Sequence, residues 1–482
     1  MPNAAAPRSP DGLAATALLI AAITLARVGL LALGTADLDV DEAQYWLWAQ
    51  EPAFGYYSKP PLIAWVIWLS TGLAGSDAAF WVRLPAPLLH GATALILAVI
   101  ARRLHSARAG LLTGAAYATL PMVSLGSLVI STDTVMLPFL AAALLLYLKL
   151  IRPGGAGRLH LALGTGLMLG LAFLAKYAAL YFLAGAALAA LSPRLRPDGR
   201  DALAILGVFA AVALPNLLWN LTNGLSTVSH TFDNTGWGGG FELDPAAMAR
   251  FLAEQVLVFG PVMFPALLFA GWRLRRRATP AEALLVMLSL PILALVALQA
   301  LVSGANANWG VAAYLSGSIL AVASLMTRRF WLFVSFAANG ALALALPLAA
   351  TQVERLSWKG ELLLARYEGR DELSRAILDE AAARGAAGIV AADRGVLADL
   401  FYTGRDAAIP VYAWPQDGPP RNHYQQSRPL PGAAGPVLAV AWGDLAPPCA
   451  GPPDITLSPG PGAYLGRAVN LWLVPQDCWT KP

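Results

Sequence analysis

Long apolar runs dominate the first 350 residues of the chain, and short polar joints separate them. Most of these runs approach twenty residues, the length that an α-helix needs to cross about 30 Å of hydrocarbon. The pattern predicts about eleven spans, at roughly 13–34, 80–101, 109–129, 134–150, 159–175, 177–192, 202–220, 250–271, 281–302, 309–326 and 330–350. The run 13–34 is too long for a signal peptide and has no small-residue cleavage site, so we expect it to be retained.

Composition agrees with this pattern. The 482 residues are 57% hydrophobic and only 13% charged, whereas a soluble domain carries about a quarter charged residues. The isoelectric point of about 9.1 would suit a nucleic-acid-binding protein, but the basic residues lie between spans, where membrane topology explains them better. The chain is therefore predicted to be an α-helical polytopic membrane protein that binds no nucleic acid.

Basic joints alternate with joints that lack basic clusters. The basic joints follow the second, fourth, sixth, eighth and tenth predicted spans. They contain Arg102, Arg103, Arg108, Lys149, Arg152, Arg158, Arg194, Arg196, Arg200, Arg273, Arg275, Arg276, Arg277, Arg328 and Arg329. Cytoplasmic joints carry an excess of Lys and Arg, so these joints and the N-terminus are predicted to be cytoplasmic. The other joints then face outward, and they hold most of the unusual polar residues. The alternation requires two spans across 159–192; a single span there would invert everything downstream.

Residues 351–482 differ from the rest, because they have ordinary charge density and many prolines. We expect them to form a separate soluble domain on the outer side, following a membrane domain at 1–350. An amphipathic helix at Asp371–Arg384 and short strands at Gly388–Ala391, Val437–Val440 and Val469–Val474 predict a small α/β fold. The two cysteines, Cys449 and Cys478, both fall here, either as a disulfide or as unpaired thiols.

An unusual polar insert, residues 37–79, follows the first span. Its acids rule out one long span, and the pattern instead predicts two helices lying in the membrane interface, at Asp41–Gln50 and Pro60–Leu73. An aromatic belt would explain the tryptophans of this insert. It explains less well the adjacent carboxylates Asp41 and Glu42, because ionisable groups near lipid are costly and usually functional.

The motifs of the chain resemble those of the bacterial GT-C glycosyltransferases. The resemblance is to the protein-mannosyltransferase-like superfamily (glycosyltransferase family 39), which includes the aminoarabinose–lipid A transferase. It covers residues 1–350 and rests on motifs in a fixed order: Asp41-Glu42-Ala43-Gln44-Tyr45-Trp46, Tyr56-Tyr57-Ser58-Lys59-Pro60-Pro61, Arg83-Leu84-Pro85, Thr132-Asp133-Thr134, Gly170 to Tyr177, Pro215 to Asn220, and Ala307-Asn308-Trp309 with Tyr314.

The resemblance implies an inverting glycosyltransferase in a bacterial cytoplasmic (inner) membrane, with its active site and C-terminal domain on the extracytoplasmic side. The donor would be a polyprenyl-phosphate-linked sugar, and the acceptor lipid A, a surface glycan or a protein. No cofactor is implied with certainty, and a divalent cation stays open. The sequence does not identify the sugar.

Three acids are the catalytic candidates that the resemblance implies. Asp41 falls at the position of the catalytic or acceptor-orienting acid of the family. Glu42 beside it points about 100° away on a helix, so a structural or supporting role is the alternative for it. Asp133 falls at the position of the second acid of the family, and the alternative is a helix N-cap near the positive end of the helix dipole.

Several residues are candidates for substrate binding. Lys59 is the main candidate for the donor phosphate, with Tyr57 beside it; Arg83, Lys176 and Tyr177 are further candidates. For the cations, the alternative is a side chain whose charge snorkels to the interface.

Three further residues belong to outer joints. In the aminoarabinose transferase a loop histidine helps to bind a metal, with a Glu just before the phosphate-binding Lys. Here His230 lies in the predicted loop 226–245, with a glycine-rich run at 236–240, but Ser58 stands at the Glu position, so a shared metal site is in doubt and the metal is unknown. Asn308 and Trp309 are candidates for sugar or phosphate contact, with an interfacial Trp as the alternative.

Two other functions stay open at this point. A transporter or lipid flippase would place ionisable groups at mid-membrane in two related halves, a pattern that the sequence does not show. A non-catalytic lipid-binding or scaffold protein is also compatible, because the Glu position is Ser58.

Overall fold

A computed structural model describes residues 11–151, 158–236, 243–431 and 435–479. The described chain divides into two compact units that interleave along the sequence. The first unit runs to Ala32 and also contains Lys59–Val66 and Arg83–Pro347. The second unit contains Leu33–Ser58, Ile67–Val82 and the residues from Leu348 onward. The polar insert therefore folds largely with the C-terminal residues, and each unit is described by itself below.

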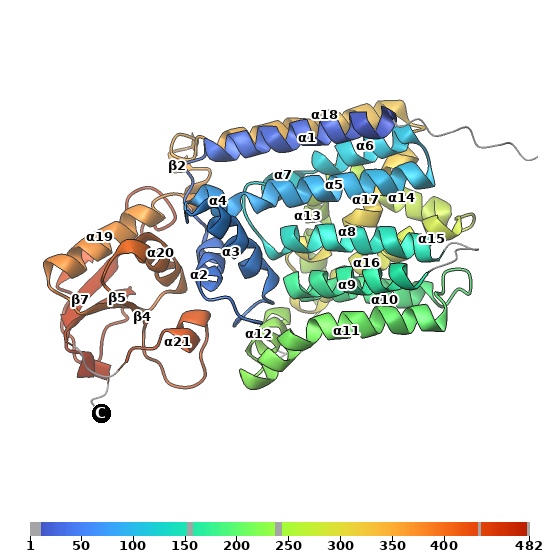
Figure 1. Ribbon diagram of the computed structural model, residues 1–482. Coiled ribbons are helices and arrows are strands. Elements are labelled where there is room, and N and C mark those ends of the chain that lie inside the picture. The colour runs from blue at the N-terminus through green and yellow to red at the C-terminus, as the bar shows by residue number, and fades with distance from the viewer. Residues whose placement is uncertain (1–10, 152–157, 237–242, 432–434, 480–482) are drawn as a thin grey trace, which may run out of the picture. The chain divides into compact units, whose positions relative to one another are not determined.

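The first unit is helical. Its helices, some of which also reach into the second unit, are α1 (Asp11–Ala32), α3 (Leu62–Ala74), α4 (Ala79–Arg83), α5 (Pro85–Leu104), α6 (Ala107–Ala118), α7 (Pro121–Gly126), α8 (Thr132–Leu150), α9 (Leu159–Ala175), η1 (Tyr177–Ala179), α10 (Leu180–Ala189), α11 (Gly199–Thr222), α12 (Ser226–Thr235), α13 (Pro245–Phe259), α14 (Met263–Leu274), α15 (Pro280–Met287), α16 (Leu290–Ser303), η3 (Ala307–Gly310), α17 (Ala313–Leu325) and α18 (Arg329–Ala350). Figure 1 shows α5, α8, α9 and α11 side by side, each packed on the next.

Membrane-spanning character follows from length and composition. Within the described residues, six helical stretches are long and apolar enough to cross a bilayer, and a bent pair, α13 with α14, makes a seventh possible span. Four shorter apolar helices of 10–17 residues accompany them. The fold class predicted from the sequence, a polytopic helical protein, is confirmed, although several predicted spans are divided into shorter helices.

The predicted span 109–129 is wrong as one continuous helix, because the chain breaks between α6 and α7 at Thr119 and Leu120. Pro121 follows the break, and the residue before a proline is disfavoured in the α conformation. The guanidinium of Arg27 fills the break. It is 5% exposed and donates to the Ala118 carbonyl at 2.5 Å, at the negative end of α6. It also donates to Ser124 Oγ at 3.1 Å.

Two other predicted spans are interrupted. The span 250–271 is bent by 106° between α13 and α14, because Gly260 adopts φ +98° before Pro261 and neither residue continues a helix. The segment 309–326 begins as the 3-10 turn η3 before α17. In contrast, the break in 159–192 is confirmed: Lys176 is extended, with φ −159°, and two helices flank it.

The second unit combines the polar insert with an α/β fold. Its elements are α2 (Val40–Gln50), β1 (Ser357–Trp358), β2 (Glu361–Leu362), η4 (Ala365–Tyr367), α19 (Arg370–Ala383), β3 (Gly388–Ala391), α20 (Arg394–Thr403), η5 (Gly404–Asp406), β4 (Val411–Ala413), α21 (His423–Ser427), β5 (Val437–Trp442), β6 (Ile455–Leu457), β7 (Val469–Val474) and η6 (Gln476–Trp479). The helix and the three strands expected from the sequence are confirmed.

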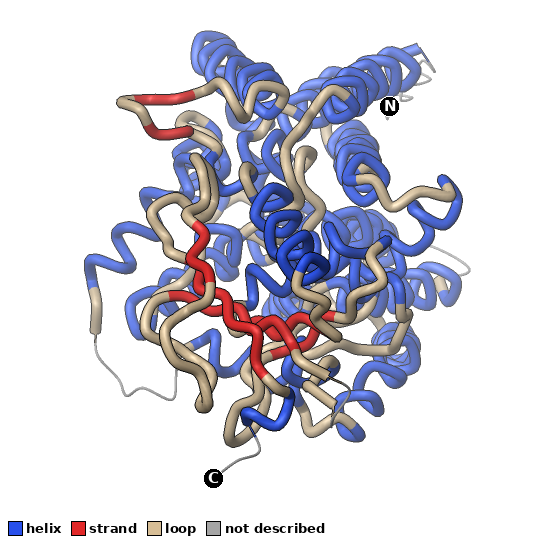
Figure 2. The backbone as a smooth tube through the Cα atoms, turned by 90° about the vertical axis from the view of Figure 1, so that its left-hand side faces the viewer, coloured by secondary structure: helices blue, strands red, loops and turns tan. Residues whose placement is uncertain are grey.

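A five-stranded mixed sheet forms the core of this unit, in the order β4-β3-β5-β7-β6. Strand β3 pairs in parallel with β4 and β5, while β7 pairs antiparallel with β5 and β6. Alternate side chains of β5, beginning with Val437, join a core cluster with Trp414 and Trp472. Helix α20 packs on β3 and β4. Figure 2 shows the strands crossing this part of the chain as one sheet.

The two cysteines form a disulfide, with a Cα–Cα distance of 5.3 Å between Cys449 and Cys478. Cys478 is fully buried in the core cluster of the sheet. The bridge therefore ties the loop that follows β5 to the end of the described chain.

Candidate functional site

The first cluster of site residues centres on Asp133, in the first turn of α8. The neighbouring Ser131 is the N-cap of this helix, since its side chain accepts the Thr134 backbone N–H at 3.2 Å. The Asp133 carboxylate is therefore not needed as the cap. Instead it accepts Lys176 Nζ at 2.7 and 2.8 Å, one contact to each oxygen, and Asn308 Nδ2 at 2.7 Å on Oδ2.

Three separate chain breaks bring these residues together. Asp133 begins α8, Lys176 occupies the extended break after α9, and Asn308 lies in the 3-10 turn η3. The side chains of Lys176 and Asp133 are only 18% and 13% exposed. An ammonium has three N–H donors, and within the described residues two of those of Lys176 are used. The third has no partner among the described residues.

The residues on either side of this cluster hold it in place. Trp309 packs against an apolar cluster that contains Phe251 and Ala300, and Gln255 Nε2 donates to the Ala307 carbonyl at 3.2 Å. Both contacts fix η3 and so the position of Asn308. The sequence-based candidates Asp133, Lys176 and Asn308 thus share one site, and Trp309 supports it from the adjacent position.

Tyr177 extends this region through buried amides of α11. Its hydroxyl donates to Asn216 Oδ1 at 2.8 Å, and Asn220 Nδ2 donates to that hydroxyl at 3.2 Å. Both asparagines are buried, at 0% and 1% exposure. Both belong to the motif from Pro215 to Asn220, but no role was predicted for them, although their four-residue spacing places them on one face of a helix.

The second cluster centres on Asp41, near the start of α2. This helix begins with a capping box: the Asp39 side chain caps the first turn, and the Asp39 N–H donates to Glu42 Oε2 at 3.1 Å. Glu42 is 2% exposed. Its carboxylate is used in the cap, whereas the Asp41 side chain is 49% exposed. The two adjacent acids therefore have different surroundings.

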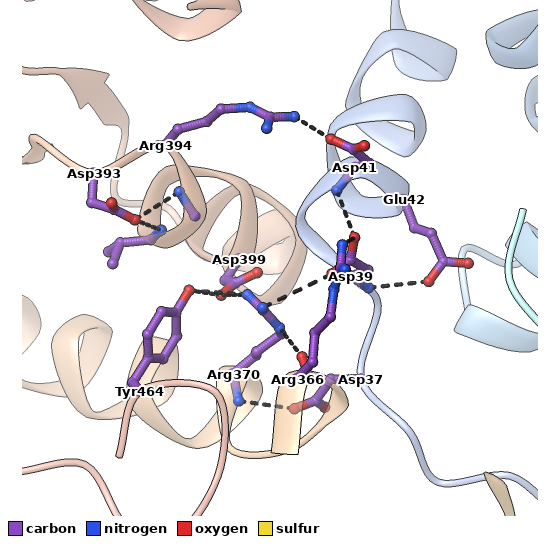
Figure 3. Close-up of polar contacts among 12 residues, drawn as sticks. Asp37, Asp39, Asp41, Glu42, Arg366, Arg370, Asp393, Arg394, Asp399 and Tyr464 are labelled. Carbon is purple, nitrogen blue, oxygen red and sulfur yellow. Dashed lines mark hydrogen bonds and ion pairs between the residues drawn. The ribbon is translucent and has the colours of Figure 1, made fainter. Parts of the chain in front are cut away.

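Arg394, the first residue of α20, contacts Asp41. Its Nη2 donates to Asp41 Oδ1, and its Nε donates to Gln44 Oε1 at 3.0 Å; Figure 3 shows the first of these contacts. Burial acts to lower the pKa of Arg394, but the Asp41 carboxylate outweighs it, so the pKa lies above the ordinary value. No motif in the sequence indicated Arg394, which lies 353 positions from Asp41.

An ionic network in which the acids Asp39 and Asp399 are buried lies beside Asp41 (Figure 3). Arg366 binds Asp39 through two nitrogens at 2.6 and 2.7 Å, and Arg370 contacts Asp399 at 3.1 Å. Burial alone raises the pKa of Asp39, but Arg366 and Arg370 outweigh it and the pKa is lowered. Burial raises the pKa of Asp399 to about 6, because Arg370 and Tyr464 offset only part of the desolvation.

Three further sequence-based candidates are Tyr57, Lys59 and Arg83. Tyr57, in the second unit, donates its hydroxyl to the Pro420 carbonyl at 3.0 Å. Lys59 and Arg83 belong to the first unit. Arg83 ends α4 and is 5% exposed, which is the exposure of a buried residue rather than of a snorkelling side chain.

His230 does not lie in a loop, so the prediction for 226–235 is wrong. This segment is helix α12, because it has no Gly or Pro to interrupt helical hydrogen bonding. His230 Nδ1 is 3.2 Å from Asn234 Nδ2, one turn later. The glycine-rich run from 237 onward lies outside the described residues.

The residues present do not fit a metal site. Across the described ranges, no three His, Cys, Asp or Glu side chains group closely enough to hold an ion, and Ser58 cannot replace the carboxylate that the resemblance would require. We therefore derive no step through a metal.

Comparisons with known proteins, by sequence and by structure, point to the same family. Residues 58–219 match the model of dolichyl-phosphate-mannose-protein mannosyltransferases. The fold is similar to that of ArnT from Cupriavidus metallidurans in its apo state (TM-score 0.65, 16% identity) and bound to undecaprenyl phosphate (TM-score 0.66, 15% identity). Both structural matches cover 94% of this chain and 97% of ArnT.

A relative of known activity extends over almost the whole chain. It is the lipid A galacturonosyltransferase RgtD of Rhizobium johnstonii, 42% identical over 471 residues, which are 96% of this chain and 98% of RgtD. Identity at this level along the full length decides against the transporter and scaffold alternatives. The chain belongs to the GT-C glycosyltransferases of the protein-mannosyltransferase-like superfamily, and it is a glycosyltransferase.

Proposed function

We propose that this enzyme transfers a galacturonosyl group from a polyprenyl-phosphate donor to lipid A. The observation that carries the proposal is the 42% identity to a lipid A galacturonosyltransferase along nearly all of both chains. The likeness to an ArnT structure that holds undecaprenyl phosphate supports a polyprenyl-phosphate leaving group.

The reaction is a displacement at the anomeric carbon. An acceptor hydroxyl of lipid A forms the new C–O bond, the bond from C1 to the phosphate oxygen breaks, and polyprenyl phosphate leaves with the electron pair. The hydroxyl proton must go to a base, and charge on the departing phosphate must be stabilised. With attack from the side opposite the phosphate, the anomeric configuration inverts.

Asp41 suits the role of the base. It is an ionisable carboxylate that is half exposed, with one oxygen held by Arg394. Asp133 suits a different role, because its carboxylate already accepts hydrogen bonds from Lys176 and Asn308. It positions these two donors, and Lys176 offers its third N–H to the donor phosphate. We assign phosphate binding to Lys59 as well, with Arg83 and Tyr177 as supporting residues.

In this proposal the orientation of the chain in the membrane follows from its joints, with the arginine-rich joints on the cytoplasmic side and the other joints on the outer side. The clusters of Asp41 and Asp133 face the extracytoplasmic side of the inner membrane, where the disulfide of the second unit also finds an oxidising compartment. Residues 1–350 supply the membrane domain and 351–482 an outer domain, and most of the polar insert folds with the latter.

A reconstituted assay tests the proposal. Purified enzyme in vesicles would receive polyprenyl-phosphate galacturonic acid and lipid A, and mass spectrometry would follow the product. We expect lipid A to gain one hexuronic acid. A matched donor that carries neutral galactose tests the sugar, and a glycan lacking acyl chains tests the acceptor. Transfer of the neutral sugar alone, or transfer only to the non-lipid acceptor, would refute the assignment.

A further inference from the structure

The helix that carries Asp41 is held by arginines from the C-terminal part of the chain. Arg366 pairs with Asp39 before the first turn of α2, and Arg428 contacts Glu51 after its last turn, at 2.6 Å. Between them, Arg394 reaches Asp41 itself. These three arginines come from η4, the segment after α21 and the start of α20, so the sheet-bearing part of the second unit fixes α2 along its length.

Aromatic contacts strengthen the same attachment. Trp46 meets Tyr402 of α20 edge to face, with ring centroids 5.1 Å apart. Both are also tied to Asp77: the Trp46 indole donates to its carboxylate at 2.9 Å, and the Tyr402 hydroxyl to its carbonyl at 2.8 Å. Helices α2 and α20 therefore move as one body, and Arg394 keeps a fixed distance from Asp41.

The geometry at Asp41 leaves one oxygen for chemistry. Oδ1 accepts Arg394 Nη2, and Gln44 Oε1 accepts the neighbouring Nε–H of the same guanidinium at 3.0 Å. Among the described residues, Oδ2 of Asp41 accepts no hydrogen bond, and the side chain is 49% exposed. Because Gln44 holds the Nε–H, the planar guanidinium directs its Nη2–H at Oδ1 more narrowly than a rotating ammonium would.

We propose that Arg394 is a positioning residue of the transferase: it holds Asp41 by Oδ1 so that Oδ2 faces the acceptor hydroxyl. The inference rests on the proposed role of Asp41 as base. It gives the C-terminal part of the chain a direct function in catalysis, because the guanidinium comes from α20. In the transfer step the acceptor proton passes to Oδ2 while Arg394 stays bound at Oδ1.

Arg394→Gln in the full-length enzyme tests this inference. Loss of the guanidinium contact at Oδ1 lets the carboxylate rotate, so we expect kcat to fall about 10–100-fold. KM for donor and acceptor should stay within about twofold, as for an interaction that acts only in the transition state. Arg394→Lys keeps the charge but not the planar guanidinium that Gln44 holds, and its kcat should lie between those of Arg394→Gln and the wild type.

Two further variants control the experiment. Arg428→Gln breaks a comparable ion pair at the other end of α2 and should change kcat by less than about threefold, as expected for an exposed pair. Gln44→Met keeps Arg394 but removes its second contact, and we expect a loss of kcat of about 2–5-fold, equivalent to a typical single hydrogen bond. If Arg394→Gln does not fold, the kcat of Gln44→Met tests whether Arg394 positions Asp41.

Several results would overturn the inference. They are an unchanged kcat in Arg394→Gln or, where that variant does not fold, in Gln44→Met; a raised acceptor KM at constant kcat; and an equal loss in Arg428→Gln. These outcomes are distinct from failure of the proposed function, in which the wild-type enzyme itself transfers no galacturonic acid.

Discussion

The two acids at the centre of the site clusters have opposite surroundings. Asp133 is 13% exposed, and its two oxygens receive three hydrogen bonds from Lys176 and Asn308. Asp41 is 49% exposed and receives its side-chain contact from Arg394 on one oxygen. A carboxylate whose acceptor sites are largely used positions its donors, whereas a carboxylate with an open oxygen is available to take a proton. The difference assigns separate roles to two residues that look equivalent in the sequence.

The largest effect on kcat is expected from a substitution at Asp41, which tests this comparison directly. Asp41→Asn keeps the shape of the side chain but cannot accept the proton, so kcat should fall by about 10²–10⁴-fold, the usual worth of a general base. The melting temperature should change little, because the side chain is half exposed. A glycosyl transfer assay measures kcat, and a thermal melt of the same variant measures the melting temperature. The interpretation fails if kcat is retained.

A smaller loss of activity and a larger loss of stability are expected at Asp133. Asp133→Asn weakens a poorly exposed pair and leaves Lys176 without its counter-charge, which should cost roughly 1–3 kcal/mol of folding free energy and reduce kcat about 100-fold through misplaced donors.

The double variant Asp133→Asn/Lys176→Gln sharpens this second test. Removal of both charges should restore part of the melting temperature, because no unpaired buried charge remains, but it should not restore activity. Recovery of transfer in the double variant would mean that Lys176 does not contact the phosphate.

The disulfide offers a way to weaken only the unit that contains Asp41. The two cysteines are 29 positions apart in the sequence. For a loop of this length, the chain-entropy model predicts that the disulfide adds about 3–4 kcal/mol to the free energy of unfolding. In Cys449→Ser/Cys478→Ser, hydrogen exchange should accelerate in β5 and β7 but not in α8 or α9. Equal acceleration in all four elements would contradict the division into two units.

The last prediction is a pH dependence of stability at Asp399, with no expected change in the catalytic groups. Since burial raises its pKa to about 6, its stabilising contribution is complete below about pH 4 and is lost as the pH rises through about 6. Each tenfold change in proton affinity is worth about 1.4 kcal/mol, so this loss amounts to about 3 kcal/mol. Asp39 acts in the opposite sense, because its pKa is lowered and its contribution is lost only in acid.

Thermal melts of wild type and Asp399→Asn between pH 4 and pH 7 check this prediction. The wild type should lose more stability than the variant over this interval, since Asn does not titrate. Parallel curves for the two proteins would remove Asp399 as the cause.

Local signals in the sequence predicted much of the fold. Asp39 and Glu42 have the spacing of a capping box, and α2 begins between them. Lys176 interrupts an apolar run, and two helices flank it as expected. Apolar runs of four to six residues became β3, β5 and β7. These features depend on neighbouring residues, which is why a single sequence reveals them.

Features that depend on distant partners could not be predicted. The break between α6 and α7 is filled by Arg27, 91 positions before the carbonyl that it contacts, although Pro121 was a local signal for it. Motif positions pointed to Asp133, Lys176 and Asn308 separately, but only the fold shows that they touch. Arg394 has no motif, and its importance comes entirely from the position of α20 against α2.

The order of synthesis gives the pairing of Asp41 with Arg394 a consequence for biogenesis. The two residues are 353 positions apart, so at roughly 5–20 residues per second the acid leaves the ribosome about 20–70 s before the arginine. During that time the nascent α2 lacks the arginine that holds Asp41. A chain that ends upstream of α20 would therefore lack the guanidinium that positions Asp41.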